Sequence, residues 1–342
     1  MVCAAAGQVF PISSFETTAS AVLIAPGLLV TNRHAVADNR RAQVFLPDRS
    51  QILADVVPTR YSGDLILLQA PDLGKLGPMG IATAETQDNL YTIGADVGRG
   101  RIRVYRPGRI VLAPSPGKPL ARLHHTAPSQ PGNSGGALVN GDGKLVAIVT
   151  SGGAGRYEAV PSSEIAKLKE LSGPKHLMES DRIGVAVKKC AEALDRANAT
   201  SQKLGDSHVD FLMDQCTASN NRQDMDLAGQ TLGRQRYFKQ SIAMFERALD
   251  QDPNAINSRL ALAITLHLAR RYEDEVTHLK RLLEVIPGDA QALRLAIQAG
   301  KWGGDEEFAE YAFALLTAHH PALADRAKQF MNLPPPPAPA PQ

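Results

Sequence analysis

The chain has 342 residues, of which 44% are hydrophobic and 21% are charged, and its formal net charge is +2. This composition is typical of globular domains, and the length favours two domains over one. The near-neutral charge argues against a large electrostatic surface for nucleic acid, so we expect no nucleic-acid partner. No apolar run reaches the roughly 18–20 residues that a membrane span needs, so none is predicted.

The start of the chain predicts export. Residues 2–7, Val-Cys-Ala-Ala-Ala-Gly, are similar to the end of a secretory signal with an Ala-x-Ala cleavage pattern. We treat residues 1–14 as an N-terminal segment and favour a periplasmic or secreted protein. The alternative is a cytoplasmic protein whose first residues happen to be small.

The three cysteines, Cys3, Cys190 and Cys216, are too few and too scattered for a disulfide framework or a zinc site. Cys190 and Cys216 lie in separate segments with helical periodicity and could pair if those segments form a hairpin. We favour two free buried thiols instead, because free cysteine behaves as a small buried hydrophobe. No metal and no cofactor are predicted.

The first half of the chain predicts short β-strands. Apolar runs alternate with turn residues such as Pro26-Gly27, Pro107-Gly108 and Gly141-Asp142-Gly143, and helical periodicity is absent. This pattern favours two small β-barrels side by side. The expected strands cover residues 19–25, 28–31, 43–46, 52–57, 65–69, 90–93, 102–105, 109–112, 121–126, 137–139, 145–150 and 157–160.

A glycine-rich segment with one serine lies at residues 131–138, Pro-Gly-Asn-Ser-Gly-Gly-Ala-Leu. Its glycines permit positive φ and a tight turn whose N–H groups converge on one point, as an oxyanion hole requires. Serine in a flexible loop is common, so Ser134 becomes a candidate nucleophile only if a base and a carboxylate accompany it.

Two polar residues interrupt the β pattern where such partners are needed. His34 ends an apolar strand and Asp64 opens an apolar run; taken singly, each is typical of a structural or exposed position. A serine hydroxyl, however, needs a neighbouring base, and histidine titrates near neutrality. A carboxylate on the other ring nitrogen fixes the tautomer. His34, Asp64 and Ser134 together therefore predict a catalytic triad.

These residues resemble the catalytic blocks of chymotrypsin-fold serine proteases, most of all the bacterial HtrA/Deg type. The blocks are residues 31–36 (Thr-Asn-Arg-His-Ala-Val), 63–68 (Gly-Asp-Leu-Ile-Leu-Leu) and 131–136, with 30 residues from His34 to Asp64 and 70 from Asp64 to Ser134. The flanking residues 23–32, 138–148 and 159–163 are also similar to that branch. The resemblance covers residues 15–165 and implies two perpendicular six-stranded barrels with the triad between them.

The resemblance also implies an oxyanion hole formed by the backbone N–H groups of Gly132 and Ser134, with Asn133 as a third candidate. Digestive relatives have Asp at the position of Asn133, where it pairs with a freed N-terminus. Asparagine cannot form that ion pair, so activation by this route is not expected.

Other positions bear on the substrate pocket. Pro128 stands where an aspartate would select basic side chains, so we expect no strong preference for Arg or Lys. Ser129, Gly152 and Gly153 are expected to line a pocket open to small or medium apolar side chains. His124 and His125 could line it as well, but we favour one packed and one exposed histidine.

From residue 183 onward the apolar periodicity is helical. Pro253, Pro287 and Pro321 follow amphipathic segments at intervals of 34 residues. This period resembles the tetratricopeptide repeat (TPR), a stacked helix pair, although the copies are degenerate. We expect a linker with a short helix at 166–182, a TPR-like domain at 183–333 and a Pro-rich disordered tail at 334–342.

The sequence thus predicts a multidomain protein with an all-β double-barrel protease domain and an all-α repeat domain. We expect a serine endopeptidase that needs no cofactor and hydrolyses protein or peptide substrates through an acyl-enzyme. We expect the repeats to bind a substrate or a protein partner, or else to support the protease or mediate self-association. The alternative is a latent or inactive protease-fold protein that acts through its repeats.

Overall fold

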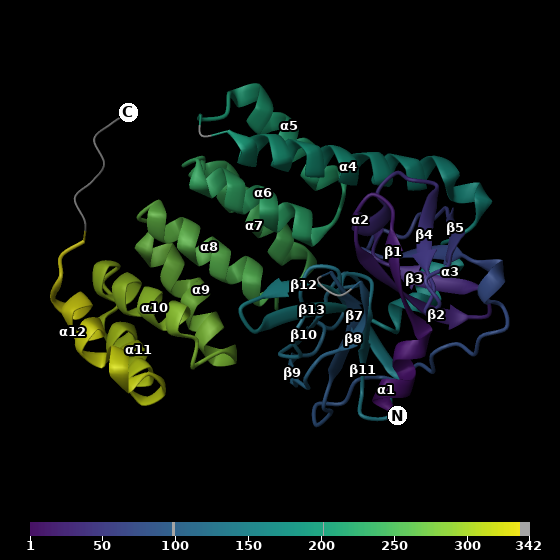
Figure 1. Ribbon diagram of the computed structural model, residues 1–342. Helices are drawn as coiled ribbons and strands as arrows, with labels where there is room; N and C mark the ends of the chain where they lie inside the picture. The colour runs from purple at the N-terminus through teal and green to yellow at the C-terminus, as the bar shows by residue number, and fades with distance from the viewer. Residues whose placement is uncertain (98–99, 201, 336–342) are drawn as a thin grey trace. The chain divides into compact units, whose positions relative to one another are not determined.

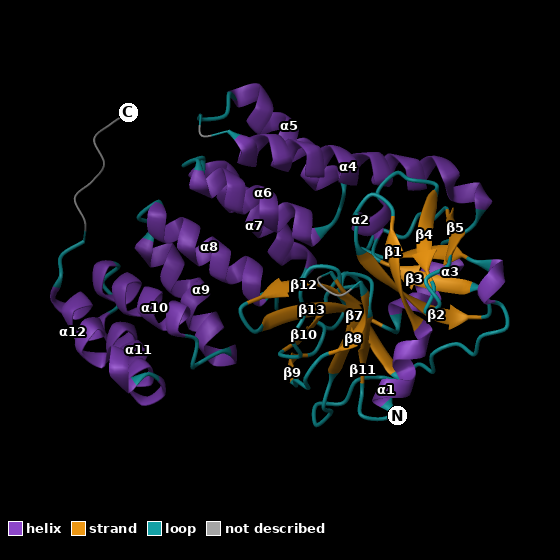
Figure 2. Ribbon diagram, viewed as in Figure 1, coloured by secondary structure: helices purple, strands orange, loops and turns teal. Residues whose placement is uncertain are grey.

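The computed structural model describes residues 1–97, 100–200 and 202–335, and the chain divides into two compact units. The first unit contains Met1–Ala228 and Asp250–Ala255, and the second contains Gly229–Leu249 and the residues from 256 onward. Strands lie in the first half of the chain and helices in the second (Figures 1 and 2). The expected tail at 334–342 falls outside the described residues from residue 336 onward.

A closed barrel forms the start of the first unit, with the strand order β1-β2-β3-β6-β5-β4. Its strands are β1 (Val9–Ser13), β2 (Ala19–Ala25), β3 (Leu28–Thr31), β4 (Arg41–Phe45), β5 (Gln51–Val57) and β6 (Ile66–Gln69). β1 pairs with both β2 and β4 and so closes the barrel. The segment at residues 1–14, expected to precede the protease domain, therefore supplies one of its strands, after a short helix α1 (Val2–Ala5).

Among the described residues, a seven-stranded sheet with the order β8-β7-β11-β12-β13-β10-β9 follows the barrel. This is one strand more than the six-stranded barrel that the resemblance implies. The expected apolar runs all overlap strands here, and the central strands β11 and β12 bury side chains such as Leu138 and Ile148 completely. The strands are β7 (Tyr91–Asp96), β8 (Arg101–Val104), β9 (Ile110–Leu112), β10 (Leu123–His125), β11 (Ala137–Val139), β12 (Leu145–Gly153) and β13 (Arg156–Pro161).

The helices α3 (Glu164–Glu170), α4 (Leu177–Ala199) and α5 (Asp206–Ala218) still belong to the first unit. α3 is the short helix expected in the linker, and its Ile165 and Leu168 are buried in the β core. The linker expected at 166–182 is thus no boundary between compact units, since packing against the strands continues through it.

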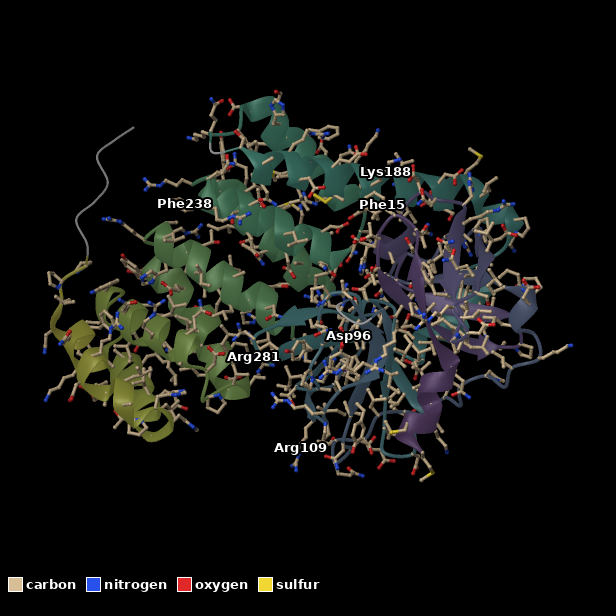
Figure 3. The ribbon with its side chains drawn as sticks, viewed as in Figure 1. Phe15, Asp96, Arg109, Lys188, Phe238 and Arg281 are labelled. Atoms are coloured by element: carbon tan, nitrogen blue, oxygen red, sulfur yellow. A yellow bond between two sulfur atoms is a disulfide. The ribbon has the colours of Figure 1, made fainter. Side chains whose placement is uncertain are left out.

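α4 packs against the first barrel beside α2 (Arg33–Val36). Ile183 and Val187 of α4 form an apolar cluster to which Phe15, between β1 and β2, contributes. Figure 3 labels Phe15 and also Lys188 of α4. The helix comes so close that a Cβ on Gly184 would lie 2.4 Å from the Ala37 carbonyl oxygen. Glycine is required at this crossing because no side chain fits.

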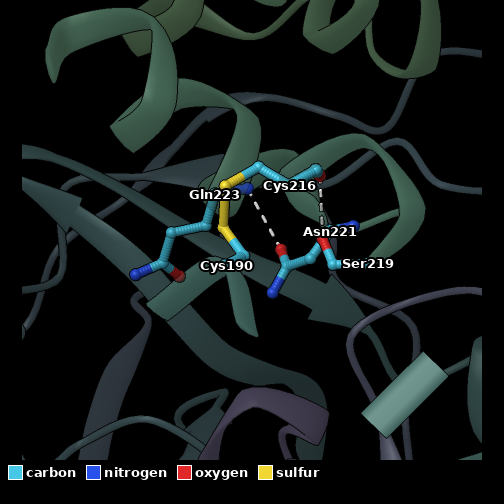
Figure 4. The surroundings of a disulfide bond; sticks show 5 residues. All are labelled: Cys190, Cys216, Ser219, Asn221 and Gln223. Carbon is cyan, nitrogen blue, oxygen red and sulfur yellow. Dashed lines mark hydrogen bonds between the residues drawn. A yellow bond between two sulfur atoms is a disulfide. The ribbon is translucent and has the colours of Figure 1, made fainter. Parts of the chain in front are cut away.

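A disulfide joins α4 to α5, which form a helical hairpin. The Cα atoms of Cys190 and Cys216 are 4.8 Å apart, and both residues are buried (Figure 4). The expectation of two free thiols is therefore wrong, and the alternative of a pair across a hairpin is right. Cys3 is free and exposed.

The remaining helices form pairs of constant length. α6 (Arg222–Arg234), α8 (Ile256–Leu268) and α10 (Ala290–Trp302) begin 34 residues apart. Their partners α7 (Phe238–Gln251), α9 (Tyr272–Val285) and α11 (Glu306–His319) keep the same interval. Two residues after the second helix of each pair stands a proline: Pro253, Pro287 and Pro321. The helix pairs therefore repeat at the 34-residue interval that the prolines predict. α12 (Ala324–Asn332) follows the last pair.

An apolar cluster of the second unit joins one helix pair to the next. Ile242 and Phe245 of α7 pack with Leu262 and Leu266 of α8. These positions repeat at helical spacing on one face of each helix, as an amphipathic helix requires. Within the described residues, no helix is both long and apolar enough to cross a membrane.

Candidate active site

His34 and Asp64 form a hydrogen-bonded pair at one end of the first barrel. His34 lies in α2, directly after β3, and Asp64 lies just before β6, which pairs with β3. The Asp64 carboxylate accepts from His34 Nδ1 at 2.8 Å and from the His34 backbone N–H at 3.1 Å. Asn32 holds the loop in place, because its side-chain amide donates to the Asp64 carbonyl at 2.9 Å.

A third donor reaches Asp64 from the second sheet. Thr150 of β12 donates its hydroxyl to Asp64 Oδ2 at 2.8 Å. Burial opposes the charged form of Asp64, but His34, Arg122 and Thr150 together hold the pKa of this carboxyl below its ordinary value. Burial likewise opposes the charged form of His34, but Asp64 outweighs it and raises the pKa of the imidazole above its ordinary value.

Ser134 lies on a tight loop before β11, and backbone geometry explains the glycines around it. Gly132 and Gly135 have φ of +92° and +81°. A Cβ on Gly135 would lie 2.1 Å from the Ser20 carbonyl oxygen, so only glycine fits. Ser20 also fixes the loop across the two sheets, since its hydroxyl donates to the Gly132 carbonyl at 2.7 Å and its N–H to the Ser134 carbonyl at 2.8 Å.

Asn133 is an internal anchor of the same loop. Its side chain is inaccessible and donates to the Ala95 carbonyl at 2.9 Å, while its Oδ1 accepts from the Gln130 N–H at 2.9 Å. The Asn133 backbone N–H donates to the Gln130 carbonyl at 3.0 Å. Among the described residues, the N–H groups of Gly132 and Ser134 have no backbone acceptor, so these two donors remain available for an anion.

The Ser134 hydroxyl donates to the Thr150 carbonyl at 3.3 Å. Within the part of the chain that the structure describes, no hydrogen bond joins Ser134 to His34. The structure therefore pairs His34 with Asp64 and brings Thr150 to both Asp64 and Ser134.

The residues expected at the substrate pocket lie on two neighbouring segments. Pro128 and Ser129 are half-buried on the loop before Ser134, and the Ser129 hydroxyl donates to Asn133 Oδ1 at 3.4 Å. Gly152 and Gly153 are exposed at the end of β12. Gly152 has φ of +123°, which favours glycine.

The expectation for His124 and His125 is wrong, because both are buried. His124 Nε2 lies 3.1 Å from Asp252 Oδ2, in the loop that follows α7. Burial lowers the pKa of His125 to about 3, so this histidine is neutral near pH 7. Neither is an exposed pocket residue.

A group of buried charges beside Asp64 escaped the sequence interpretation. Arg122, Glu158 and Arg222 have side chains no more than 4% exposed, and each arginine contacts Glu158. Charged residues in a sequence are normally solvated, so only their three-dimensional proximity reveals this group. Within the described residues, no set of three or more His, Cys, Asp or Glu side chains could hold a metal ion.

The closed barrel, the second sheet and the His34–Asp64 pair define a chymotrypsin-like protease domain. In agreement, residues 19–148 match the trypsin-like peptidase domain family. The chain therefore contains such a domain, followed by an all-helical region.

The curated relatives are HtrA proteases. The chain is 28% identical over 175 residues to the serine protease Do-like HtrA of Bacillus subtilis (strain 168), an alignment that covers 46% of this chain and 39% of the relative. It is 28% identical over 168 residues to the periplasmic pH-dependent serine endoprotease DegQ of Escherichia coli (strain K12), covering 45% and 36%. These matches confirm the resemblance to the HtrA type. The chain spans less than half the length of either relative.

Among solved structures, the HtrA-type protease AlgW with tripeptide is 30% identical, with a TM-score of 0.44. The match covers 49% of this chain and 61% of that chain.

Proposed function

We propose that the protein is a serine endopeptidase with His34, Asp64 and Ser134 as its catalytic triad. The observation that supports this best is the 2.8 Å bond from His34 Nδ1 to Asp64. Beside it, the backbone N–H groups of Gly132 and Ser134 have no backbone acceptor among the described residues. The bond fixes the proton on Nδ1 and leaves the Nε2 lone pair to accept the proton of Ser134.

The mechanism follows from these positions. Substrate binding exchanges the bond from Ser134 to the Thr150 carbonyl for one from Ser134 to His34 Nε2. Ser134 Oγ attacks the peptide carbonyl carbon, its proton passes to Nε2, and the scissile C–N bond breaks as His34 protonates the leaving amine. The N–H groups of Gly132 and Ser134 stabilise the oxyanion. Water then hydrolyses the acyl-enzyme by the same route.

The pocket residues favour small or medium apolar side chains at the cleavage site. Pro128 offers no charge to a basic side chain, and exposed Gly152 and Gly153 leave room for the substrate. The 34-residue helix pairs resemble tetratricopeptide repeats, and we propose that they bind a protein substrate or a partner.

A fluorophosphonate probe with casein as substrate tests the peptidase. The native protein should become labelled at Ser134 and cleave casein, whereas Ser134→Ala should do neither. Ser50→Ala, in the exposed turn between β4 and β5, is the matched control and should label like the native protein.

The bond between Ser134 and the Thr150 carbonyl favours one rival, a latent protease fold that acts through its repeats. Folded native protein that neither labels nor cleaves, with or without a partner, would support this rival and end the peptidase proposal. Cleavage of a short-chain ester without cleavage of casein would identify an esterase instead.

A further inference from the structure

Four buried side chains of alternating charge lead from the proposed triad to a repeat helix. Asp64, Arg122, Glu158 and Arg222 have exposed side-chain fractions of 1%, 4%, 1% and 1%. Asp64 lies just before β6 of the first barrel, and Arg122 lies just before β10 of the second sheet. Glu158 lies in β13, and Arg222 is the first residue of α6. All four lie in the first compact unit.

Arg122 is shared between two carboxylates. Its Nη1 donates to Glu158 Oε2 at 3.2 Å and to the Ser151 hydroxyl at 2.9 Å. Its Nη2 lies 4.0 Å from Asp64 Oδ2 and donates to Asn221 Oδ1 at 3.2 Å. Because the two Nη atoms of Arg122 face different carboxylates, a stronger interaction of Arg122 with Glu158 weakens its interaction with Asp64.

Arg222 supplies the second cation for Glu158. Its Nη2 donates to Glu158 Oε2, and its Nη1 donates to Asp226 at 3.3 Å. Burial opposes the charged form of Glu158, but Arg222, His124 and Arg122 hold the pKa of this carboxyl far below its ordinary value. Two buried carboxylates beside a single guanidinium would leave one charge uncompensated, which is costly.

The start of α6 is held firmly where Arg222 reaches Glu158. Asn221 Oδ1 accepts from the Gln223 N–H at 3.0 Å and so caps the helix, and the Asn221 N–H donates to the Ser219 hydroxyl at 3.2 Å. Ser219 donates in turn to the Cys216 carbonyl at 2.9 Å, directly beside the disulfide (Figure 4). The backbone that carries Arg222 is therefore tied to the α4–α5 hairpin.

We propose that Arg222 is a positioning residue of the peptidase site. By compensating Glu158, it leaves Arg122 beside Asp64, and this arrangement sets the charge and orientation of the Asp64–His34 pair. The first repeat helix thereby completes the active site. The inference rests on the proposed peptidase function.

Other ionisable groups also act on this pair. His34 is influenced by Glu16 and Asp224, whereas Asp64 interacts with Arg33 and with Tyr61. Glu16, Arg33 and Tyr61 stay in place in the variants below. Because Asp224 itself titrates near neutrality, each variant is also measured with Asp224→Asn, so that its titration is not mistaken for that of His34.

The two single variants should shift the pKa of His34 in opposite directions, and the double variant should cancel the shift. Arg222→Met removes a cation and draws Arg122 toward Glu158, so the pKa of His34 rises and the acidic limb of kcat/KM moves up by about 0.5–1 pH unit. Glu158→Gln frees Arg122 for Asp64, so the limb moves down. Arg222→Met with Glu158→Gln restores charge balance and returns the limb toward its native position. We expect kcat to fall roughly tenfold in Arg222→Met with KM little changed.

Controls separate positioning from folding. Arg222→Lys keeps the positive charge, so the acidic limb of kcat/KM should stay at its native pH. Arg182→Met removes an exposed charge of α4 and should change neither this limb nor kcat. Thermal unfolding checks each variant. If Arg222→Met does not fold, Glu158→Gln and Arg222→Lys carry the test. Loss of activity with unchanged limbs, or shifts of one sign in both single variants, would overturn the proposal.

NMR titration of the His34 imidazole gives the same test without turnover. The opposite shifts should appear there even in protein that the fluorophosphonate probe does not label. Such a result would reject the peptidase function and retain the Arg222 network. If the protein is labelled and active but the pKa of His34 is the same in all variants, the peptidase function is retained and the role of Arg222 is rejected.

Discussion

At the scale of single residues, Asp224 is a charged group with an unusual setting. It lies in the first turn of α6 with 8% of its surface exposed, and its Oδ2 has no hydrogen-bond partner among the described residues. Burial raises the pKa of this carboxyl to about 7, with the nearby Asp64 carboxylate adding to the effect. Asp224 therefore changes its charge near neutrality, and this charge acts on the His34 imidazole.

Replacing Asp224 should change stability in a pH-dependent way. Its folded pKa of about 7 exceeds the ordinary 3.8, so stability falls as pH rises between these values and stays reduced above them. Asp224→Asn should raise the free energy of unfolding at pH 8 by up to about 4 kcal/mol and change it little at pH 3.5. Urea unfolding at both pH values measures this.

The exposed Asp195→Asn on α4 is the control and should leave both values unchanged. Equal effects of Asp224→Asn at the two pH values would contradict an ionised, buried carboxyl. The same variant removes a negative charge near His34, so the acidic limb of kcat/KM should move to lower pH.

The sequence predicts the residues whose types and spacing match a known reaction. It does not predict the residues that are recognised only by their neighbours in the fold. His34 and Asp64 interrupt apolar runs at a spacing that a known reaction explains, and the structure pairs them. Glu158 and Arg222, 64 residues apart, carry no such signal. A charge is expected in solvent unless a partner is known, and only the fold supplies the partner.

At the scale of elements, the alternation of apolar and polar residues predicts most strands but not the first strand of the chain. β2, β3 and β11 have the expected bounds. β1 was missed because Pro11 interrupts its run, and proline normally argues against a paired strand. The disulfide was misjudged because the sequence does not show that α4 and α5 are antiparallel neighbours.

The disulfide should be a major source of stability for the α4–α5 hairpin. It joins cysteines 26 residues apart, and closing a loop of this length stabilises a fold by about 3 kcal/mol. Cys190→Ala with Cys216→Ala should lower the free energy of unfolding by about 2–4 kcal/mol in denaturant titration. Because Ser219 and Asn221 follow Cys216 directly, hydrogen exchange at the start of α6 should also become faster.

Cys3→Ser provides the matched control, since Cys3 is free and exposed. It should unfold like the native protein. A double alanine variant with native stability and native exchange at α6 would show that packing alone holds the hairpin.

At the scale of the whole molecule, the repeat period was predictable and the unit boundary was not. Prolines mark the end of each helix pair, so a 34-residue interval is visible in the sequence. The expected boundary near residues 166–182 relied on the change from strands to helices. The compact unit instead extends to Ala228 and includes Asp250–Ala255. Within this unit, Arg222 contacts Glu158 of β13, and Asp252 contacts His124 of β10.

The division of the chain predicts which shortened proteins keep a stable protease unit. A chain that ends at residue 285 retains Asp250–Ala255, including Asp252, which accepts from the Arg122 N–H at 3.1 Å and contacts His124. A chain that ends at residue 228 loses both interactions, so the Arg122 N–H and His124 Nε2 lose these partners. Unsatisfied buried polar groups cost about 1–3 kcal/mol each.

We therefore expect the 1–285 protein to retain the thermal transition of the protease unit and the labelling of Ser134. The 1–228 protein should melt at a clearly lower temperature and resist trypsin less. Full-length Asp252→Asn, which keeps the shape but removes the charge, should show an intermediate loss. If 1–228 matches 1–285 in melting and in protease resistance, the 250–255 segment is no part of the protease unit. Retention of both properties by 1–285 alone would show that the 250–255 segment belongs to the protease unit.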